Sequence, residues 1–232
     1  MQSETPKVAL FVVTYNAPRL LVPQLEGLRR FCKDDFDIIL IDNSTDKAAA
    51  EAIKYHGEGC KYLKTNASSK MGSGSHSFAA NLGYSKFSEG YDFQFWIDHD
   101  IFATKPFSVV EILGEKLMAG LGQEKSKTYF WPGCFMFNAN EVKDVDFSPS
   151  LGLDTGGNTY NLIEKHGLEN CVFFGEEYFE NPHFRCENPK YNHYTVINDM
   201  FYHMVGGSDW EGVDRNEERL GSLLNILEEK TR

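Results

Sequence analysis

Short apolar runs alternate with segments of helical spacing through the first part of the chain. Residues 7–14 (KVALFVVT) and 36–41 (FDIILI) are apolar and rich in β-branched residues, which predicts two buried strands, and residues 60–63 predict a third. Residues 20–31 place leucine and phenylalanine three or four positions apart, and residues 47–55 are rich in alanine, so both segments predict helices. Strands that alternate with helices predict an α/β fold with a mostly parallel sheet.

The pattern is less regular in the rest of the chain. The further expected helices cover residues 77–87, 107–121, 157–167 and 216–230, and the further expected strands cover residues 91–97, 129–138, 172–179 and 195–204. Residues 64–75 are rich in serine, lysine and glycine and predict a polar loop, while residues 180–194 predict irregular structure. The sequence contains neither internal repeats nor a linker that would divide it, so we expect a single domain over residues 1–232.

One expected strand ends in an acidic sequence. Residues 91–97 (YDFQFWI) lead directly into Asp98-His99-Asp100. Open α/β sheets bind their ligands just beyond the carboxyl ends of their strands. Two carboxylates placed there offer the hard oxygen ligands that suit Mg²⁺ or Mn²⁺ carrying a phosphate. A solvated acidic turn is the alternative interpretation of the same residues.

A second strand end favours the metal site over the acidic turn. Asp42 directly follows the strand at 36–41. Because the carboxyl ends of parallel strands meet at one edge of a sheet, we expect Asp42, Asp98 and Asp100 to converge. A divalent cation at such a site can neutralise the charge of a departing diphosphate. The sequence has no GxxxxGK[ST] motif and no GxGxxG after the first strand, which excludes a Walker-type NTPase and that dinucleotide-binding fingerprint.

Composition limits the class of protein. The 232 residues are 41% hydrophobic and 25% charged, which is ordinary for a globular protein with a core, and the net charge of −11 disfavours a broad electrostatic grip on nucleic acid or anionic membrane. The five cysteines form no CxxC pair, which is typical of reduced cytosolic thiols. Neither a signal sequence nor an apolar run of about 18 residues is present. We therefore expect a soluble cytoplasmic protein, including a peripheral position at the membrane.

Three motifs in a fixed order resemble a known group of enzymes. Residues 12–16 (VVTYN), 41–44 (IDNS) and 98–100 (DHD) resemble the GT-A fold glycosyltransferases, most closely the family-2-like group. The resemblance is good over residues 7–105 and loose over residues 106–232. It implies a Rossmann-like α/β fold with a mixed, mostly parallel central sheet flanked by helices. The first of these ranges would be the nucleotide-binding half and the second the acceptor-side half.

The resemblance also implies an activity. Enzymes of this kind use Mn²⁺ or Mg²⁺ and move a sugar, hexosyl or pentosyl, from a UDP- or GDP-sugar to a hydroxyl of a glycan, a lipid-linked sugar or another acceptor, here with expected inversion. The negative net charge disfavours a nucleic acid acceptor but leaves one open. Two alternatives also stay open. A nucleotidyltransferase should carry a glycine-rich basic loop after the first strand, which Thr14-Tyr15-Asn16-Ala17 does not resemble, and a non-catalytic module would only bind the nucleotide sugar.

Site residues follow from the matching positions. The resemblance implies that Thr14, Tyr15, Asn16 and Asp42 bind the nucleotide, that Asp98 faces both its ribose and the metal, that Asp100 is the principal metal ligand, and that His203 completes the metal shell. Manganese accepts histidine as well as carboxylate. A histidine simply packed among Phe201, Tyr202 and Met204 is the alternative for His203.

The catalytic base is expected near the start of an acceptor-side helix. Asp154 occupies that kind of position in Leu-Asp-Thr-Gly-Gly, although an aspartate before a helix is also a common N-cap. Asp199 and Asp209 are further candidates for the base. Trp131 and Trp210 are candidate platforms for stacking a sugar ring, and core packing is the alternative for both.

Overall fold

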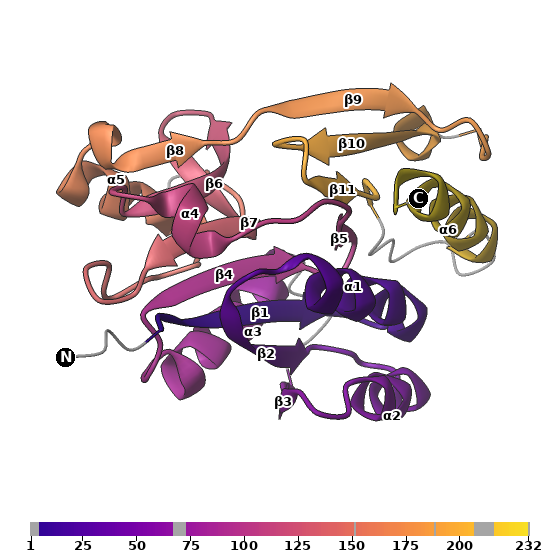
Figure 1. Cartoon of the computed structure of the whole chain (residues 1–232), viewed down its shortest axis with the longest axis horizontal. Helices are drawn as coiled ribbons and strands as arrows, with labels where there is room; N and C mark the ends of the chain where they lie inside the picture. The colour runs from indigo at the N-terminus through magenta and orange to yellow at the C-terminus, as the bar shows by residue number, and fades with distance from the viewer. Residues whose placement is uncertain (1–4, 67–72, 151, 188, 207–215, 232) are drawn as a thin grey trace.

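The computed structural model describes residues 5–66, 73–150, 152–187, 189–206 and 216–231. Its central sheet contains β1 (Lys7–Thr14), β2 (Asp35–Asp42), β3 (Lys61–Lys64), β4 (Phe93–Asp98), β6 (Met118–Glu124), β7 (Thr128–Asn138) and β8 (Cys171–Phe173). The spatial order is β3-β2-β1-β4-β7-β6-β8, so β4 lies in the middle of seven strands (Figure 1). Strand β7 is antiparallel to both of its neighbours, and the other pairs are parallel. The expected mixed, mostly parallel sheet is confirmed.

Helices cover both faces of this sheet. Helices α1 (Pro18–Phe31), α2 (Lys47–His56) and α4 (Val109–Leu113) share one core cluster with β1, β2 and β4. Helices α3 (Ser73–Phe87) and α5 (Tyr160–His166) contribute to a second cluster on the other face. Strand β1 is buried from Val8 to Thr14 because it lies inside the sheet between two helical layers. The burial of both faces of β1 explains why its sequence is apolar without alternation.

A second, smaller sheet begins where β4 ends. It consists of β5 (Ile101–Ala103), β11 (Phe201–His203), β10 (His193–Ile197) and β9 (Glu176–Glu180), paired antiparallel in this order. One face contributes Ile101, Ile197 and Phe201 to the core shared with α1, and the other face packs against α6 (Asn216–Thr231). In Figure 1 this sheet lies at the upper right, above β1, β2 and β4, with α6 beside it.

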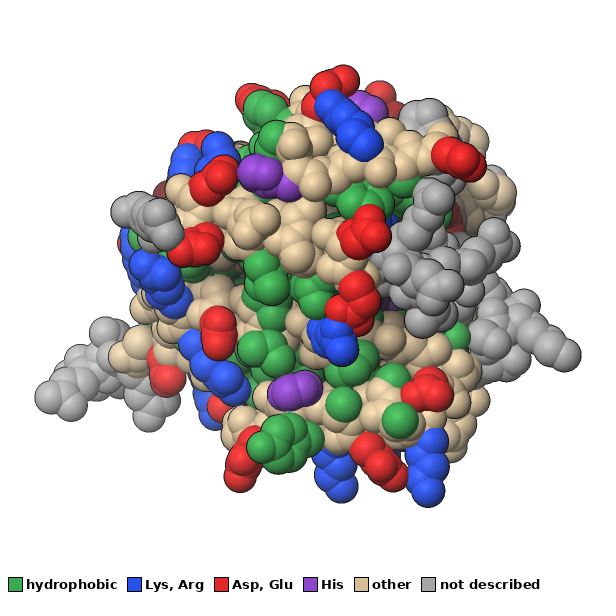
Figure 2. Space-filling view, turned by 90° about the vertical axis from the view of Figure 1, so that its right-hand side faces the viewer, with side chains coloured by type: hydrophobic (Ala, Val, Ile, Leu, Met, Phe, Trp, Pro, Cys, Tyr) green, Lys and Arg blue, Asp and Glu red, His purple; other side chains and the backbone are tan. Residues whose placement is uncertain are grey.

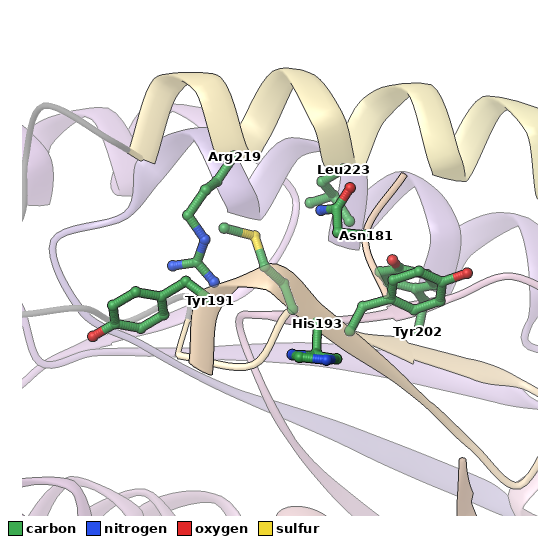
Figure 3. Close-up of a pocket in the computed structure, with 8 residues that line it drawn as sticks. Asn181, Tyr191, His193, Tyr202, Arg219 and Leu223 are labelled. Atoms are coloured by element: carbon green, nitrogen blue, oxygen red, sulfur yellow. The ribbon is translucent and has the colours of Figure 1, made fainter. Parts of the chain in front are cut away.

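Arg219 of α6 binds the segments that flank β10 and β11 of the second sheet. Arg219 is buried and donates to the backbone oxygens of Val205 (2.7 Å) and Gly206 (3.1 Å), while its guanidinium lies 4.6 Å from the ring centre of Tyr191. Figure 3 shows Arg219 reaching from the helix toward Tyr191 in a small pocket that Tyr202 also lines.

Among the described residues, no helix has both the length and the apolar character needed to cross a membrane.

The expected helix at 107–121 is wrong. Helix α4 ends at Leu113, Gly114 follows with φ +52°, and residues 118–124 form β6 between β7 and β8. Leu113, Leu117 and Leu121 keep a four-residue spacing that imitates a helix. A short apolar segment buried on both faces has no reliable period of its own, so the pairing partners decided its structure.

Two expected strands are each divided. Residues 172–179 split into β8 and β9, which belong to different sheets. Residues 195–204 form the β10–β11 hairpin, because Asn198 and Asp199 both adopt positive φ (49° and 57°) and Met200 N donates to Ile197 O at 3.1 Å. Asparagine and aspartate tolerate this conformation, which suits the tight three-residue connection Asn198–Met200 between the two strands.

Most other boundaries agree with the pattern to within a few residues. The strands at 7–14, 36–41, 60–63, 91–97 and 129–138 are confirmed, as are the helices at 20–31, 47–55, 77–87 and 216–230. The expected helix at 157–167 is a 3₁₀ turn, Gly157–Thr159, followed by α5. Helix α3 begins at Ser73, inside the expected loop at 64–75, and residues 67–72 of that loop lie outside the described part of the chain.

Candidate active site

The acidic segment after β4 joins the two sheets and is held by buried polar groups. His99 donates its backbone N–H to Val13 O at 3.2 Å, and its Nδ1 lies 3.2 Å from the same oxygen. Gln24, buried in α1, donates to the backbone oxygens of Asp98 (2.6 Å) and Ile101 (3.0 Å). Gln24 gave no signal in the sequence. Its contacts fix the direction in which the carboxylates leave the sheet.

Asp98 is paired with a histidine from α3. His76 Nε2 lies 2.7 Å from Asp98 Oδ1, and the two side chains are only 23% and 13% exposed. Burial would raise the pKa of Asp98, but the charge and hydrogen bond of His76 hold that pKa below its usual value. Burial would likewise lower the pKa of His76, and Asp98 raises it instead. No motif in the sequence points to His76, which lies near the start of a helix in a serine-rich segment.

Asp100 lies beside His203, where β5 and β11 pair in the second sheet. Ile101 of β5 pairs with His203 of β11. Asp100 directly precedes Ile101, and its Oδ2 lies 4.0 Å from His203 Nε2. Both side chains are nearly buried. The ring centre of Trp131 lies 5.4 Å from that of His203. Trp131 therefore adjoins His203, although the two residues are far apart in the sequence.

His203 has polar neighbours on its other side. Its Nδ1 lies 3.6 Å from Glu176 Oε1 and 3.2 Å from Thr195 Oγ1. Burial would lower the pKa of His203, but Glu176 and Asp100 raise it above its usual value. Phe201, Tyr202 and Met204 are close in sequence, yet the ring of His203 contacts carboxylates and a hydroxyl. Glu176 was not recognised from the sequence, because its partners lie on other strands.

The loops after β1 and β2 are joined by side-chain hydrogen bonds. Asn16, with φ 45°, accepts from the backbone N–H groups of Thr45 and Asp46 at 3.0 Å each, and its own N–H donates to Ser44 Oγ at 2.9 Å. Tyr15 Oη lies 2.9 Å from Thr45 Oγ1. The two loops therefore form one rim at the carboxyl edge of the sheet.

Asp42 is buried beneath this rim. Its Oδ2 accepts from the Tyr62 hydroxyl at 2.6 Å and its Oδ1 from Ser44 N at 2.8 Å. Thr14 is also buried, and its Oγ1 has no hydrogen-bond partner among the described residues. A hydroxyl buried in this way is available to a ligand that reaches the strand end.

The three strand-end aspartates share an edge but not a direction. Thr14 pairs with Asp42, and Val13 pairs with Asp98. Because consecutive residues of a strand point to opposite faces, the side chains of Asp42 and Asp98 leave the sheet on opposite faces. Asp100 follows Asp98 by two residues, and both carboxylates raise the pKa of His76. The sequence predicted the common edge, and the strand register decided the directions.

Asp154 is exposed in the turn before the 3₁₀ helix Gly157–Thr159. Its carboxylate accepts from Thr155 N at 2.8 Å, whereas the N-cap positions of the 3₁₀ helix and of α5 are Gly156 and Thr159, and neither makes a side-chain cap. Asp154 therefore does not act as the N-cap of either helix. Its charge, like those of Asp98 and Asp100, raises the pKa of His76.

The remaining candidates differ in their positions. Asp199 lies in the β10–β11 turn, where it pairs with Lys105 at 2.5 Å. Trp131 is half-buried in β7 at the stretch where the pairing with β6 shifts register. Asp209 and Trp210 lie outside the described residues.

The donor atoms suit a divalent cation that takes part of its shell from a ligand. No group of three or more histidine, cysteine, aspartate or glutamate side chains in the described ranges is arranged to hold a metal by itself. Asp100 Oδ2 and His203 Nε2 face each other at 4.0 Å and offer one hard oxygen and one nitrogen. Mn²⁺ accepts both types, and Mg²⁺ and Mn²⁺ commonly take further ligands from phosphates and water.

Figure 2 shows the side of the molecule toward which β1, β2 and β4 point. Acidic, basic and hydrophobic side chains are interspersed there, and the described residues in this view form no continuous basic surface. A phosphate-bearing ligand on this side would therefore depend on individual contacts rather than on a broad positive field.

Comparisons with known proteins give a fold. No family model and no characterised protein matches the sequence. The structure resembles the mannosyltransferase PcManGT from Pyrobaculum calidifontis in complex with GDP-Man and Mn²⁺, with 11% identity and a TM-score of 0.52 over 74% of this chain and 55% of that one. It also resembles an active-site mutant of LgtC, with 13% identity and a TM-score of 0.53 over 94% of this chain and 95% of that one. This chain thus corresponds to about half of the mannosyltransferase but to nearly the whole length of LgtC, and it has the GT-A fold.

Proposed function

We propose that this protein is a metal-dependent glycosyltransferase that moves a sugar from a UDP- or GDP-sugar to a hydroxyl acceptor. The observation that carries the proposal is the Asp100–His203 pair at the carboxyl edge of the central strand of a GT-A fold. Open α/β sheets bind ligands at this edge. The similar mannosyltransferase structure contains GDP-Man and Mn²⁺, which supports a nucleotide sugar and a cation as ligands here.

The nucleotide is assigned to the rim formed by the loops after β1 and β2. Thr14, Tyr15 and Asn16 would contact the nucleoside, and the buried hydroxyl of Thr14 supports this role. Asp42 would accept hydrogen bonds from the base or ribose, while Asp98 would face the ribose. Asp42 on β2 and Asp98 on β4 lie on either side of Thr14 on β1, and this placement supports a single ligand that crosses the edge from β2 to β4.

Mn²⁺ or Mg²⁺ would be held by Asp98, Asp100 and His203. When bound, the cation supplies positive charge next to the diphosphate that leaves the sugar. Asp100 and His203 would hold it directly, since they face one another. Asp98, which is paired with His76, would contribute a further carboxylate oxygen. Gln24 keeps that segment in place.

Asp154 is the proposed general base of an inverting transfer. It would take the proton of the acceptor hydroxyl while the acceptor oxygen bonds to the anomeric carbon and the bond from that carbon to the diphosphate breaks. The exposed side chain of Asp154 and its electrostatic influence on His76 support this assignment. The sugar transferred would be a hexose or pentose.

A glycan or a lipid-linked sugar is the proposed acceptor, bound by the half of the chain at 106–232. The half-buried ring of Trp131, next to His203, supports a sugar-stacking surface adjacent to the cation site. The proposed location is the cytoplasm, including its membrane face.

The decisive experiment is hydrolysis of nucleotide sugars by the purified chain in the presence of Mn²⁺. UDP- and GDP-hexoses and -pentoses are screened for release of the free nucleoside diphosphate, with Asp100→Asn as the inactive variant and Asp35→Asn as the control. Asp35 is exposed at the amino end of β2, the opposite edge of the sheet. We expect Mn²⁺-dependent release from one donor class in the parent and in Asp35→Asn, and little from Asp100→Asn.

Two other results would lead to different functions. Binding of a nucleoside diphosphate without any turnover, and without dependence on Mn²⁺, would indicate a binding module. Release of pyrophosphate from a nucleoside triphosphate and a sugar phosphate would indicate a nucleotidyltransferase.

A further inference from the structure

Two side chains, Thr195 of β10 and Glu176 of β9, adjoin the ring of His203 at Nδ1. We infer that Glu176 is a positioning residue that fixes the His203 ring with Nε2 toward Asp100, so that this nitrogen can bind the cation. The inference rests on the cation site of the proposed function and assigns Glu176 a role in it. Glu176 itself does not contact the proposed cation.

Strand register brings Glu176 and His203 to the same face of the second sheet. Thr195 of β10 pairs with His203 of β11, and Ile197, two residues further on, pairs with Glu176 of β9. Residues that pair directly, and residues two apart on one strand, share a face. Thr195 therefore lies between Glu176 and His203, and its short side chain allows them to approach to 3.6 Å.

The hydrogen bonds determine which ring nitrogen carries a proton on this side. The Thr195 hydroxyl donates to Glu176 Oε1 at 2.7 Å, so its single hydrogen is used there. Its oxygen lies 3.2 Å from His203 Nδ1 and can only accept from that nitrogen. The Glu176 carboxylate, 3.6 Å from Nδ1, is also an acceptor. Both neighbours therefore require Nδ1–H, which leaves Nε2 as the nitrogen that can bind a cation.

The opposite side of the ring faces the proposed ligand set. His203 Nε2 lies 4.0 Å from Asp100 Oδ2. A ring rotated by half a turn would place a carbon atom where Nε2 now lies, and packing against Trp131 would hardly distinguish the two orientations. Among the described residues, the close polar contacts at Nδ1 distinguish them, together with the more distant Asp100 carboxylate at Nε2. Carboxylates that hold metal-binding histidines in this way commonly affect metal affinity about 10–100-fold.

The test measures Mn²⁺ binding to the full-length protein, without nucleotide and with UDP or GDP, by the electron paramagnetic resonance signal of free Mn²⁺, with each nucleotide alone as the blank. Glu176→Ala removes the acceptor, and Glu176→Gln keeps an oxygen that can accept from Nδ1. Thr195→Val keeps the volume of the threonine but removes its hydroxyl. The matched control is Glu177→Ala, an exposed glutamate next in the strand whose side chain points to the opposite face. Melting curves establish that each variant is folded.

We expect Glu176→Ala to weaken Mn²⁺ binding about tenfold. Glu176→Gln should restore much of this loss, Thr195→Val should weaken binding to a smaller extent than Glu176→Ala, and Glu177→Ala should match the parent. A merely structural Glu176 would lower the melting temperature and leave the Mn²⁺ affinity unchanged. Equal losses in Glu176→Gln and Glu176→Ala would mean that only the charge matters, and would also overturn the inference.

The result separates this inference from the function on which it rests. If Asp100→Asn loses Mn²⁺ binding and folded Glu176→Ala does not, the cation site stands and the role of Glu176 is wrong. If the parent binds no Mn²⁺ at millimolar concentration, either without nucleotide or with UDP or GDP, the cation site and the role of Glu176 are both wrong. If Glu176→Ala does not fold, Thr195→Val decides, and parental affinity in that variant overturns the inference.

Discussion

His76 Nε2 lies 2.7 Å from Asp98 Oδ1, so the first carboxylate of the acidic segment is already paired with a base from α3. The second carboxylate, Asp100, has its histidine at 4.0 Å. This longer separation leaves room for an ion between the two donors, whereas the shorter one is a direct hydrogen bond. The two aspartates therefore differ in role, although they lie one residue apart.

The first prediction concerns Asp100. Asp100→Asn keeps the shape of the side chain but removes the charge that attracts a cation, so stabilisation of the protein by UDP or GDP should lose its dependence on Mn²⁺. Asp98→Asn should also weaken this stabilisation. The measurement is the thermal shift with each nucleotide, with and without Mn²⁺. Parental shifts in both variants would show that the cation is bound elsewhere.

The second prediction concerns the nucleotide. Removing one partner of a buried hydrogen bond to a charged group costs about 1.5–3 kcal/mol, so Asp42→Ala should raise the nucleotide Kd about tenfold or more. Calorimetric titration measures the change. The control is Tyr62→Phe, which removes the internal hydrogen bond to Asp42 at 2.6 Å but keeps the carboxylate. It should lower stability and preserve nucleotide affinity. Parental affinity in folded Asp42→Ala would move the nucleotide to another part of the rim.

The third prediction concerns the chemical step. If Asp154 is the base, Asp154→Asn should bind donor and Mn²⁺ normally but turn over about 10²–10⁴-fold more slowly, the usual contribution of a positioned base. Its melting temperature should change little, because Asp154 caps neither of the two helices that follow it. Steady-state kinetics with the donor found by the hydrolysis screen give the answer. Parental turnover would eliminate Asp154, and Asp199 and Asp209 would be tested next.

The fourth prediction concerns the packing of α1 on the second sheet. A Cβ added at Gly27 would lie 2.8 Å from the backbone oxygen of Ala103, which cannot move aside as a flexible side chain would. Gly27→Ala should therefore destabilise the fold by about 1–3 kcal/mol in denaturant unfolding. Gly221→Ala is the matched control, since Gly221 is also helical and no described atom lies within 4 Å of its added Cβ. That variant should gain about 0.5–1 kcal/mol from helix propensity, and equal effects would contradict the packing argument.

The fifth prediction concerns pH. A hydrogen bond from Tyr91, aided by Lys61 and opposed by partial burial, holds the pKa of Asp37 below its usual value. A carboxyl with a lowered folded-state pKa stabilises the fold above its unfolded-state pKa, and this contribution is lost as the pH falls through the folded-state value. The melting temperature of Asp37→Asn should therefore lie below that of the parent at neutral pH, and the difference should shrink below about pH 4. Asp35→Asn, exposed on the same strand, should stay close to the parent throughout, and a difference for Asp37→Asn that grows in acid would contradict the assignment.

The sequence by itself determined the elements whose signals are local. A strand buried on both faces must be apolar throughout, as β1 and β2 are, and an amphipathic helix must repeat its apolar residues with the helical period, as α1 does. The acidic segment at 98–100 was also visible, because it directly follows a strand with an unmistakable apolar sequence. These features depend only on neighbouring residues, so they predicted most strands and helices of residues 7–105 and the edge of the sheet where the candidate site lies.

The tertiary structure decided what depends on partners far away in the sequence. Residues 118–121 are apolar enough for helix or strand, and their position between β7 and β8 made them a strand. The contacts of His76 with Asp98 and of Glu176 with His203 join different elements, and they depend on helix docking and on the register of three strands. A shift of one residue in that register would turn the side chain of His203 to the other face of its sheet. Local sequence does not encode that register, and it is the packing of the whole chain that places Glu176, Thr195 and His203 on one face beside Asp100.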